Sequence, residues 1–301
     1  MVSVIIPTHK RANLLFYELE RIYNQKNVEI EVVVVNDIEE EDETDRITEL
    51  FPDVIYIKSS QIQGPSEKHK KGFSITTGEY VYMPDDDDYL IDEHFFEKAE
   101  KKFQNDSTIS LVSGNVNIRY EDENHVETKT IKQKLNISGK INGFEYLQEF
   151  QHRYTKPAST VSTLFRRNAL NGNMIEMSDS SLYIQALFGG DAFIMDDIVA
   201  VYRVRSIKGH SLTSSASLPF IINVLKQKEQ FYFRAKEVLQ YPKNFWSCHF
   251  IATFSLLANK PNSRNERVNL VRWGFAHSHG SLRMIFFLVK QIVILLFRNE
   301  K

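Results

Sequence analysis

The sequence has only one cysteine, Cys248, in 301 residues, which excludes an internal disulfide and favours a reducing compartment. Its 37 lysines and arginines nearly balance 39 aspartates and glutamates, and a net charge of −2 gives no sign of bulk nucleic-acid affinity. It contains no internal repeat and no low-complexity tract. The N-terminus begins with a strand pattern and shows no signal peptide, so we expect a cytoplasmic protein.

Strand-like and helix-like segments alternate in the first third of the chain. Buried-strand patterns cover residues 2–6, 30–35, 54–58 and the run from residue 80, and helical spacing covers residues 13–25 and 66–77. This alternation predicts an α/β fold with a parallel, doubly wound sheet. Ligands of such sheets bind beyond the carboxyl ends of the strands, so Pro7, Thr8, Asp37 and the acids Asp85–Asp88 should share one crevice.

The pattern changes near residue 106. We expect strands over residues 109–118, 126–135, 160–166 and 193–205, the last broken at Asp196 and Asp197, and a helix over residues 182–188. From Pro219 onward the chain is predicted to be helical, over residues 220–239, 245–257, 265–275 and the C-terminal stretch.

Four consecutive aspartates, Asp85–Asp88, follow the buried run that begins at Tyr80. So many like charges at a strand end repel one another unless they are compensated. Mg²⁺ or Mn²⁺ takes oxygen ligands, and carboxylates two residues apart on an extended segment point the same way. An acidic surface turn is the alternative, but four aspartates directly after a buried strand favour a metal site.

Four motifs occur in a consistent order: Val4–Thr8 with Arg11, Val34–Asp37, Gly72 with Gly78–Tyr80, and Asp85–Asp88. Together they resemble the family-two glycosyltransferases of bacterial surface-polysaccharide synthesis. The resemblance implies an α/β GT-A fold, a Rossmann-like mixed sheet with helices on both faces, plus a C-terminal helical region. It implies a nucleotide-sugar-binding half at 1–105, an acceptor-binding half at 106–215 and helices at 216–301.

The resemblance also implies roles on the donor side. Pro7, Thr8 and Arg11 would border the nucleotide, and Asp37 would accept a hydrogen bond from a uracil N–H. Asp85 and Asp86 would lie on the nucleotide side, with Asp85 at the ribose or a metal-bound water. Asp87 would ligate the Mn²⁺ or Mg²⁺ that bridges the diphosphate. Without the family, Asp37 alone is equally typical of a turn.

Cationic residues are expected near the diphosphate. Lys68 and Lys71 are candidates on the predicted helix, although a solvated helix face is an equally good interpretation. The sequence departs from the family here, because the usual arginine-asparagine pair falls on His69 and Lys70. Arg203 and His210, together with Arg205, would belong to a segment that closes over the diphosphate.

Asp179 falls on the position of the family's general base, which takes the proton of the acceptor hydroxyl. The acid that usually precedes it is replaced by Ser178, and Glu176 is the fallback. The alternative for Asp179 is a helix N-cap or first-turn acid. A single base opposite the leaving group implies inversion at the anomeric carbon.

The predicted function is therefore an inverting, metal-dependent hexosyltransferase. It would move a sugar from a UDP-sugar to a saccharide or lipid-linked acceptor, for example in capsule synthesis. A non-catalytic sugar-binding GT-A scaffold is the main alternative, and a metal-dependent phosphohydrolase is a weaker one.

The C-terminal stretch Met284–Phe297 is apolar except for Lys290 and Gln291. It is shorter than the roughly 20 residues that span a bilayer. Arg283, Lys290 and Arg298 recur at near-heptad spacing and leave a wide apolar face. Two interpretations stay open: a helix on the inner face of the cell membrane, or a buried packing or oligomer helix.

Overall fold

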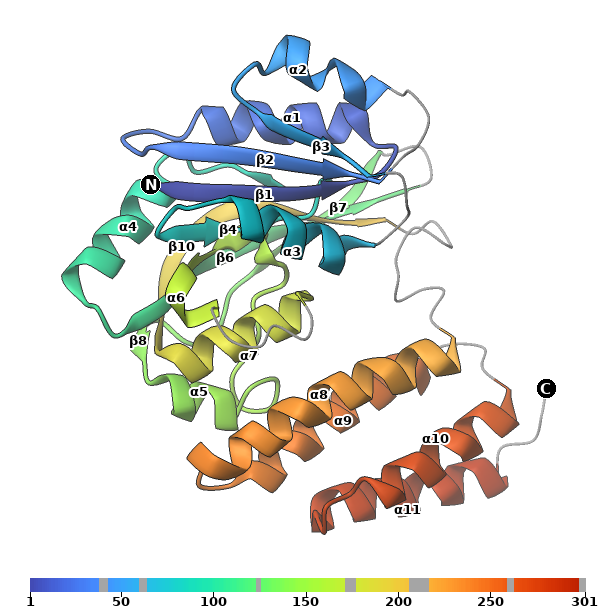
Figure 1. Ribbon diagram of the computed structural model, residues 1–301. Helices are drawn as coiled ribbons and strands as arrows, with labels where there is room; N and C mark the ends of the chain where they lie inside the picture. The colour runs from blue at the N-terminus through green and yellow to red at the C-terminus, as the bar shows by residue number, and fades with distance from the viewer. Residues whose placement is uncertain are drawn as a thin grey trace. The chain divides into compact units, whose positions relative to one another are not determined.

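The structure is a computed structural model that describes residues 1–37, 43–59, 64–122, 126–170, 177–205, 217–258 and 263–297. The chain divides into two compact units (Figure 1). The first comprises residues 1–146 and 156–206, and the second comprises residues 147–155 and 207–301.

The first unit is built on one sheet of ten strands in the described residues. Along the sheet the order is β3 (Ile55–Lys58), β2 (Ile30–Asn36), β1 (Val2–Thr8), β4 (Tyr80–Tyr82), β9 (Thr163–Arg166), β6 (Ile109–Glu121), β10 (Asp191–Arg205) and β5 (Tyr89–Leu90). Two further strands lie off this path, with β7 (Glu127–Gln133) pairing β6 and β8 (Gly139–Ile141) pairing β10.

The sheet is mixed, as the predicted fold class states. β3, β2, β1 and β4 are parallel, whereas β9 runs antiparallel to both β4 and β6. The parallel arrangement predicted from the first third of the chain therefore holds for β1 to β4. β10 runs parallel to β6 and antiparallel to β5 and β8.

Helices α1 (Ala12–Tyr23) and α3 (Pro65–Ile75) cover opposite faces of the parallel strands (Figure 1). Successive side chains of a strand alternate between faces. Val4 and Ile6 of β1 accordingly belong to the same core cluster as Leu19 of α1, while Ile5 faces Gly72 of α3. The remaining helices of this unit are η1 (Glu43–Arg46), α2 (Ile47–Leu50), α4 (Phe95–Asn105), α5 (Gly143–Gln148), η2 (Thr160–Ser162), α6 (Arg167–Leu170) and α7 (Asp179–Gly189).

Two predicted boundaries differ from the structure. Pro7 does not end the first strand, because β1 continues to Thr8 with Pro7 in register with Val35; proline removes one donor but keeps a φ compatible with an extended chain. Helix α3 begins at Pro65 rather than at Ser66, since proline is favoured at the first helical position.

The acids Asp196 and Asp197 do not break the strand that was expected around them. β10 continues through both residues, and its register against β6 shifts between Ile194 and Ile198. An irregularity of this kind accommodates extra residues in one strand, and regular pairing of β10 with β6 continues on either side of it.

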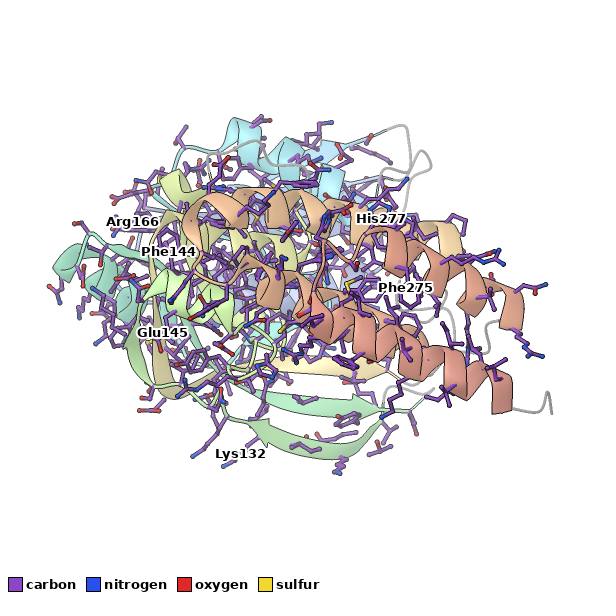
Figure 2. All side chains as sticks on the ribbon, turned by 90° about the horizontal axis from the view of Figure 1, so that it is seen from below. Lys132, Phe144, Glu145, Arg166, Phe275 and His277 are labelled. Atoms are coloured by element: carbon purple, nitrogen blue, oxygen red, sulfur yellow. The ribbon has the colours of Figure 1, made fainter. Side chains whose placement is uncertain are left out.

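The second unit is helical, with α8 (Leu218–Val238), α9 (Pro242–Ala258), α10 (Arg264–Ala276) and α11 (Leu282–Phe297). Rings of Trp246, Phe250 and Trp273 pack together in its interior, and His277 stacks on Trp273. Figure 2 labels His277 just beyond α10. Among the described residues, none of the helices combines the length and apolar character that crossing a bilayer requires.

The close approach of α3 to β1 yields a first prediction. A Cβ at Gly72 would overlap the side chain of Ile5 in the central strand, so Gly72→Val should lower the free energy of unfolding by about 1–3 kcal/mol. Urea unfolding followed by circular dichroism measures this. The control is Ser74→Ala on the exposed side of the same helix. Equal midpoints for the two variants would contradict the predicted packing.

Candidate functional site

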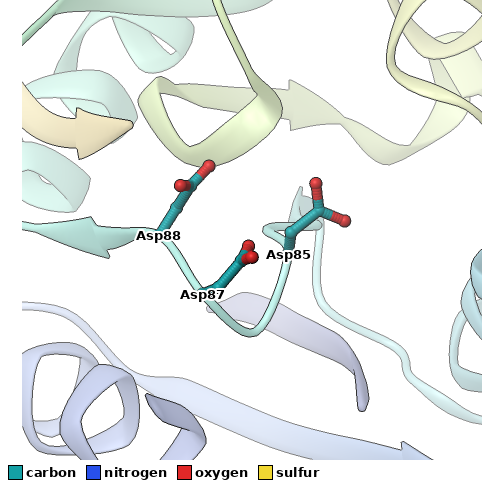
Figure 3. Close-up of side chains that lie close together, drawn as sticks. All are labelled: Asp85, Asp87 and Asp88. Atoms are coloured by element: carbon teal, nitrogen blue, oxygen red, sulfur yellow. The ribbon is translucent and has the colours of Figure 1, made fainter. Parts of the chain in front are cut away.

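Three carboxylates of the acidic loop converge. The loop follows β4 and leads into β5, and carboxylate oxygens of Asp85, Asp87 and Asp88 all lie within 4.8 Å of one another (Figure 3). Asp88 is buried, and Asp85 and Asp87 are half-buried. Oxygen donors at this spacing suit a hard divalent cation such as Mg²⁺ or Mn²⁺.

The acidic run is not the extended segment that we expected, because residues 86 and 87 form a turn. Asp85 and Asp87, two residues apart, nevertheless converge, and Asp88 joins them. Asp86 instead accepts hydrogen bonds from Thr8 Oγ1 and from Arg11, both at 2.8 Å. Its carboxylate therefore ties the acidic loop to the end of β1.

Asp88 is held by hydrogen-bond partners that are distant in the sequence, so local sequence patterns could not identify them. Ser159 Oγ donates a hydrogen bond to it at 2.9 Å, and the backbone N–H of Arg203 donates another at 2.8 Å. The only signal for Asp88 in the sequence was its membership of the acidic run. These two bonds fix the orientation of one carboxylate that the sequence did not single out.

Burial and mutual repulsion dominate the electrostatics of the loop. Burial raises the pKa of Asp85 well above its ordinary value, and the nearby charges of Asp179 and Asp87 raise it further. Burial likewise raises the pKa of Asp88, with Asp87 adding to the effect. Such a cluster gains free energy by taking up a cation or protons.

Two arginines compensate the cluster in part. Arg11 donates to Asp87 Oδ2 at 3.1 Å, besides its bond to Asp86. Arg205 NH1 lies 3.7 Å from Asp87 Oδ2, and its Nε lies 3.4 Å from Glu121. Arg205 is thus shared between the acidic loop and a glutamate of β6.

A fifth acid, Glu18 of α1, lies in the interior close to the loop. It is fully buried, and neither of its carboxylate oxygens has a hydrogen-bond partner among the described residues. Burial raises the pKa of Glu18 well above the ordinary value, and the fields of Asp86 and Asp88 act in the same direction. Burial and the neighbouring acids therefore both favour the protonated, neutral form of Glu18. Sequence reasoning missed it because it stands within an ordinary helical pattern.

Asp37 forms the second part of the site, at the end of β2. It is 2% exposed, and its two oxygens lie 2.8 Å from His9 Nδ1 and 3.1 Å from Lys68 Nζ. Lys68 Nζ also donates to the carbonyl of Thr8 at 2.8 Å. Lys68 thus joins the ends of β1 and β2, and its contact with the diphosphate stays a prediction. His9 was not anticipated.

Asp179 begins α7, and Ser178 rather than Asp179 is the N-cap residue. Of the two alternatives for Asp179, the N-cap is wrong and the first-turn acid is correct, a position that interacts favourably with the helix dipole. Lys156 Nζ lies 3.9 Å from Asp179 Oδ2 and 5.3 Å from the ring centroid of Tyr183. The electrostatic influence of Asp179 on Asp85 shows that it lies near the acidic loop. Lys156 is a further residue that sequence reasoning missed.

His69 is buried on α3, where the resemblance places an arginine. Burial lowers the pKa of His69 to about 4, against the opposing field of Asp179. The imidazole is therefore neutral at physiological pH and supplies no positive charge to a phosphate.

The remaining predicted site residues have different environments. Pro7 is buried in β1, and Lys71 is exposed on α3. The guanidinium of Arg203 lies 4.8 Å from the ring centroid of Tyr89, so it stacks on an aromatic face. His210 and Glu176 lie outside the described residues.

Comparison with known sequences identifies a family. The sequence model described as glycosyl transferase family 2 matches residues 3–171. A relative from Rickettsia bellii, named an uncharacterized glycosyltransferase, is 25% identical over 186 residues, covering 61% of this chain and 26% of the relative. A Campylobacter jejuni GalNAc(5)-diNAcBac-PP-undecaprenol beta-1,3-glucosyltransferase is 25% identical over 159 residues, covering 50% of this chain and 51% of the relative. The matches thus span about half or less of these relatives.

Solved structures share the fold. Residues 1–349 of S. aureus TarS in complex with UDP-GlcNAc match with a TM-score of 0.70 at 17% identity, over 98% of this chain and 88% of that one. The mannosyltransferase PcManGT from Pyrobaculum calidifontis, in complex with GDP-Man and Mn²⁺, matches with a TM-score of 0.51 at 18% identity, over 99% and 88%. These likenesses confirm the GT-A fold with C-terminal helices.

The buried imidazole of His69 yields a second prediction. Its pKa lies below the unfolded value of 6.5, so the unfolded chain takes up the proton first and stability is lost as the pH falls from 6.5 to about 4. The loss attributable to His69 is up to about 1.4 kcal/mol per pH unit. Urea unfolding across this range should show a shallower pH dependence for His69→Gln than for the wild type. The control, exposed His94→Gln, should keep the wild-type slope; an unchanged slope in His69→Gln would contradict the neutral buried state.

Proposed function

The chain belongs to glycosyl transferase family 2 and is a glycosyltransferase, and from that premise we propose that it transfers a sugar from a UDP-sugar with inversion and with the help of a divalent cation. The acceptor we propose is a saccharide or a lipid-linked saccharide of surface-polysaccharide synthesis. Family membership gives no support to the phosphohydrolase or to the non-catalytic scaffold considered from the sequence. The observation that carries the proposal is the convergence of Asp85, Asp87 and Asp88.

The proposed cation is Mn²⁺ or Mg²⁺, held by Asp87 with Asp85 and Asp88. The donor set fits, because three carboxylate oxygens lie within 4.8 Å of one another and burial disfavours leaving their charges unpaired. When bound, the cation supplies stabilisation of the charge that develops on the leaving diphosphate. The bond from Arg11 to Asp87 keeps that ligand oriented.

We assign Asp37 to the nucleotide base. Its carboxylate is buried, and His9 and Lys68 hold it in one orientation. An ionised carboxylate is an acceptor-only group, which is the partner that a uracil N–H requires. The likeness to a structure solved with UDP-GlcNAc supports a uridine nucleotide, with Pro7, Thr8 and Arg11 at its border.

Asp179 is the proposed general base. The acceptor hydroxyl oxygen attacks the anomeric carbon, Asp179 takes the hydroxyl proton, and the bond from that carbon to the diphosphate oxygen breaks. Attack from the face opposite the leaving group inverts the configuration. Lys156 lies beside the carboxylate and opposes its negative charge without forming a short ion pair.

Removal of the metal ligand is the third prediction. Asp87→Asn should abolish the increase in melting temperature that Mn²⁺ with UDP produces in the wild type, because the cation loses a central ligand. It should also abolish Mn²⁺-dependent release of UDP from UDP-sugars. Exposed Asp53→Asn is the matched control and should behave like the wild type. A full response to Mn²⁺ in Asp87→Asn would refute this ligand assignment.

Removal of the base is the fourth prediction. Asp179→Asn should lower the rate of transfer by about 10²–10⁴-fold, the usual contribution of a positioned base. Its affinity for UDP with Mn²⁺, measured by calorimetry, should stay within about twofold of the wild type, since Asp179 lies on the acceptor side. Ser180→Ala, one residue further along α7, is the control. Normal turnover in Asp179→Asn would exclude it as the base.

A further inference from the structure

Helix α11 presents a second apolar face to solvent. Leu282, Phe286, Val289, Val293 and Leu296 recur at spacings of four and three residues, which places them on one side of the helix. Their exposed fractions are 71%, 73%, 46%, 47% and 66%. These five residues are called the α11 stripe below. An apolar stripe of this extent on a described surface indicates an interaction site.

The stripe is not needed for packing within the helical unit. The opposite side of α11 already supplies the core contacts, with Met284 and Leu288 fully buried. The ring of Phe287 packs edge-on against Phe254 of α9. Helix α11 is therefore apolar on both sides, and only one side is used by its own unit.

The surroundings of the stripe are cationic. Arg283 and Lys290 each stand next to a stripe residue, and the sequence of α11 contains no acid. Residues 263–297 contain one acid, Glu266, and five basic residues, although the whole chain carries −2. The five are Arg264, Arg267, Arg272, Arg283 and Lys290.

An apolar groove continues the surface beside the stripe. It lies between α10 and α11, where Phe275, labelled in Figure 2, and Leu296 of the stripe are among its lining residues. Arg264 and Arg272 of α10 border the same groove, and both are exposed. Apolar side chains with guanidinium groups beside them match an amphiphile that has an acyl chain and an anionic headgroup.

We propose that the α11 stripe and its flanking cations bind the surface of an anionic lipid bilayer, with α11 lying in the plane of the interface. Sixteen residues of helix extend about 24 Å, less than the roughly 30 Å of a hydrocarbon core, so α11 lies on the bilayer rather than across it. Apolar residues enter the acyl boundary, and basic residues pair with anionic headgroups.

A second copy of the chain fits this surface less well. A two-fold contact joins the same patch on both copies, so it must be complementary to itself. If α11 packed on α11 of a second copy, Arg283 and Lys290 would find no acid on the partner helix to pair with them. The charge of the patch is complementary to anionic lipid instead.

Flotation of the full-length protein with vesicles tests the proposal without donor or acceptor, so its outcome is independent of the proposed transfer reaction. The wild type should float with vesicles of phosphatidylcholine and phosphatidylglycerol, should float much less with phosphatidylcholine alone, and should be released by salt. Phe286→Gln should weaken the partition about tenfold or more, because a large apolar side chain no longer enters the bilayer. Lys290→Glu should weaken it about fivefold or more.

Matched controls lie on α8 of the same unit. Phe220→Gln and Lys236→Glu replace exposed residues of the same types outside the stripe and should partition like the wild type. Circular dichroism establishes that each variant is folded, and Lys290→Glu tests the charge separately from the apolar change. Equal loss in stripe and control variants, or no flotation of the wild type, would overturn the proposal. A dimer in sedimentation that Phe286→Gln dissolves, without vesicle binding, would overturn it in favour of a second copy.

Discussion

Repulsion among the acids at the end of β4 is the constraint on which the site depends. Four adjacent carboxylates are kept in place by bonds from separate parts of the first unit: from Thr8 and Arg11 to Asp86, and from Ser159 to Asp88. These bonds come from segments that precede and follow the loop in the sequence. Folding therefore brings four carboxylates close together, and a bound cation would reduce the repulsion among them.

The neighbouring groups respond to that charge in different ways. The pKa of Glu18, buried in α1 near the loop, is raised by burial and by the fields of Asp86 and Asp88, which favours its neutral form. Arg11 and Arg205 neutralise Asp87 only in part, since each also bonds another acid. The acids of the loop therefore keep an excess of negative charge, and a cluster of that sign suits a metal ion better than a bare phosphate.

Helix α3 connects the acidic loop with the site at Asp37. Lys68 bonds the carboxylate of Asp37 and the carbonyl of Thr8, so its charge serves the nucleotide end of the site. The next residue, His69, is buried and neutral, and it stands where the family has an arginine. His69 therefore supplies no positive charge to a diphosphate. In the second unit, exposed apolar residues of α11 lie beside Arg283 and Lys290 in the sequence.

The sequence by itself determined the strands of the first third, the position of Asp37 and the acidic run at strand ends, and the family. These follow from local periodicity and from motif order, which need no knowledge of distant contacts. Only the tertiary structure decided which three of four aspartates converge, because the turn at residues 86 and 87 sets their directions. It also decided that Lys68 is bound to Asp37 and that Lys156 lies beside Asp179, since burial and pairing depend on segments far apart in the chain.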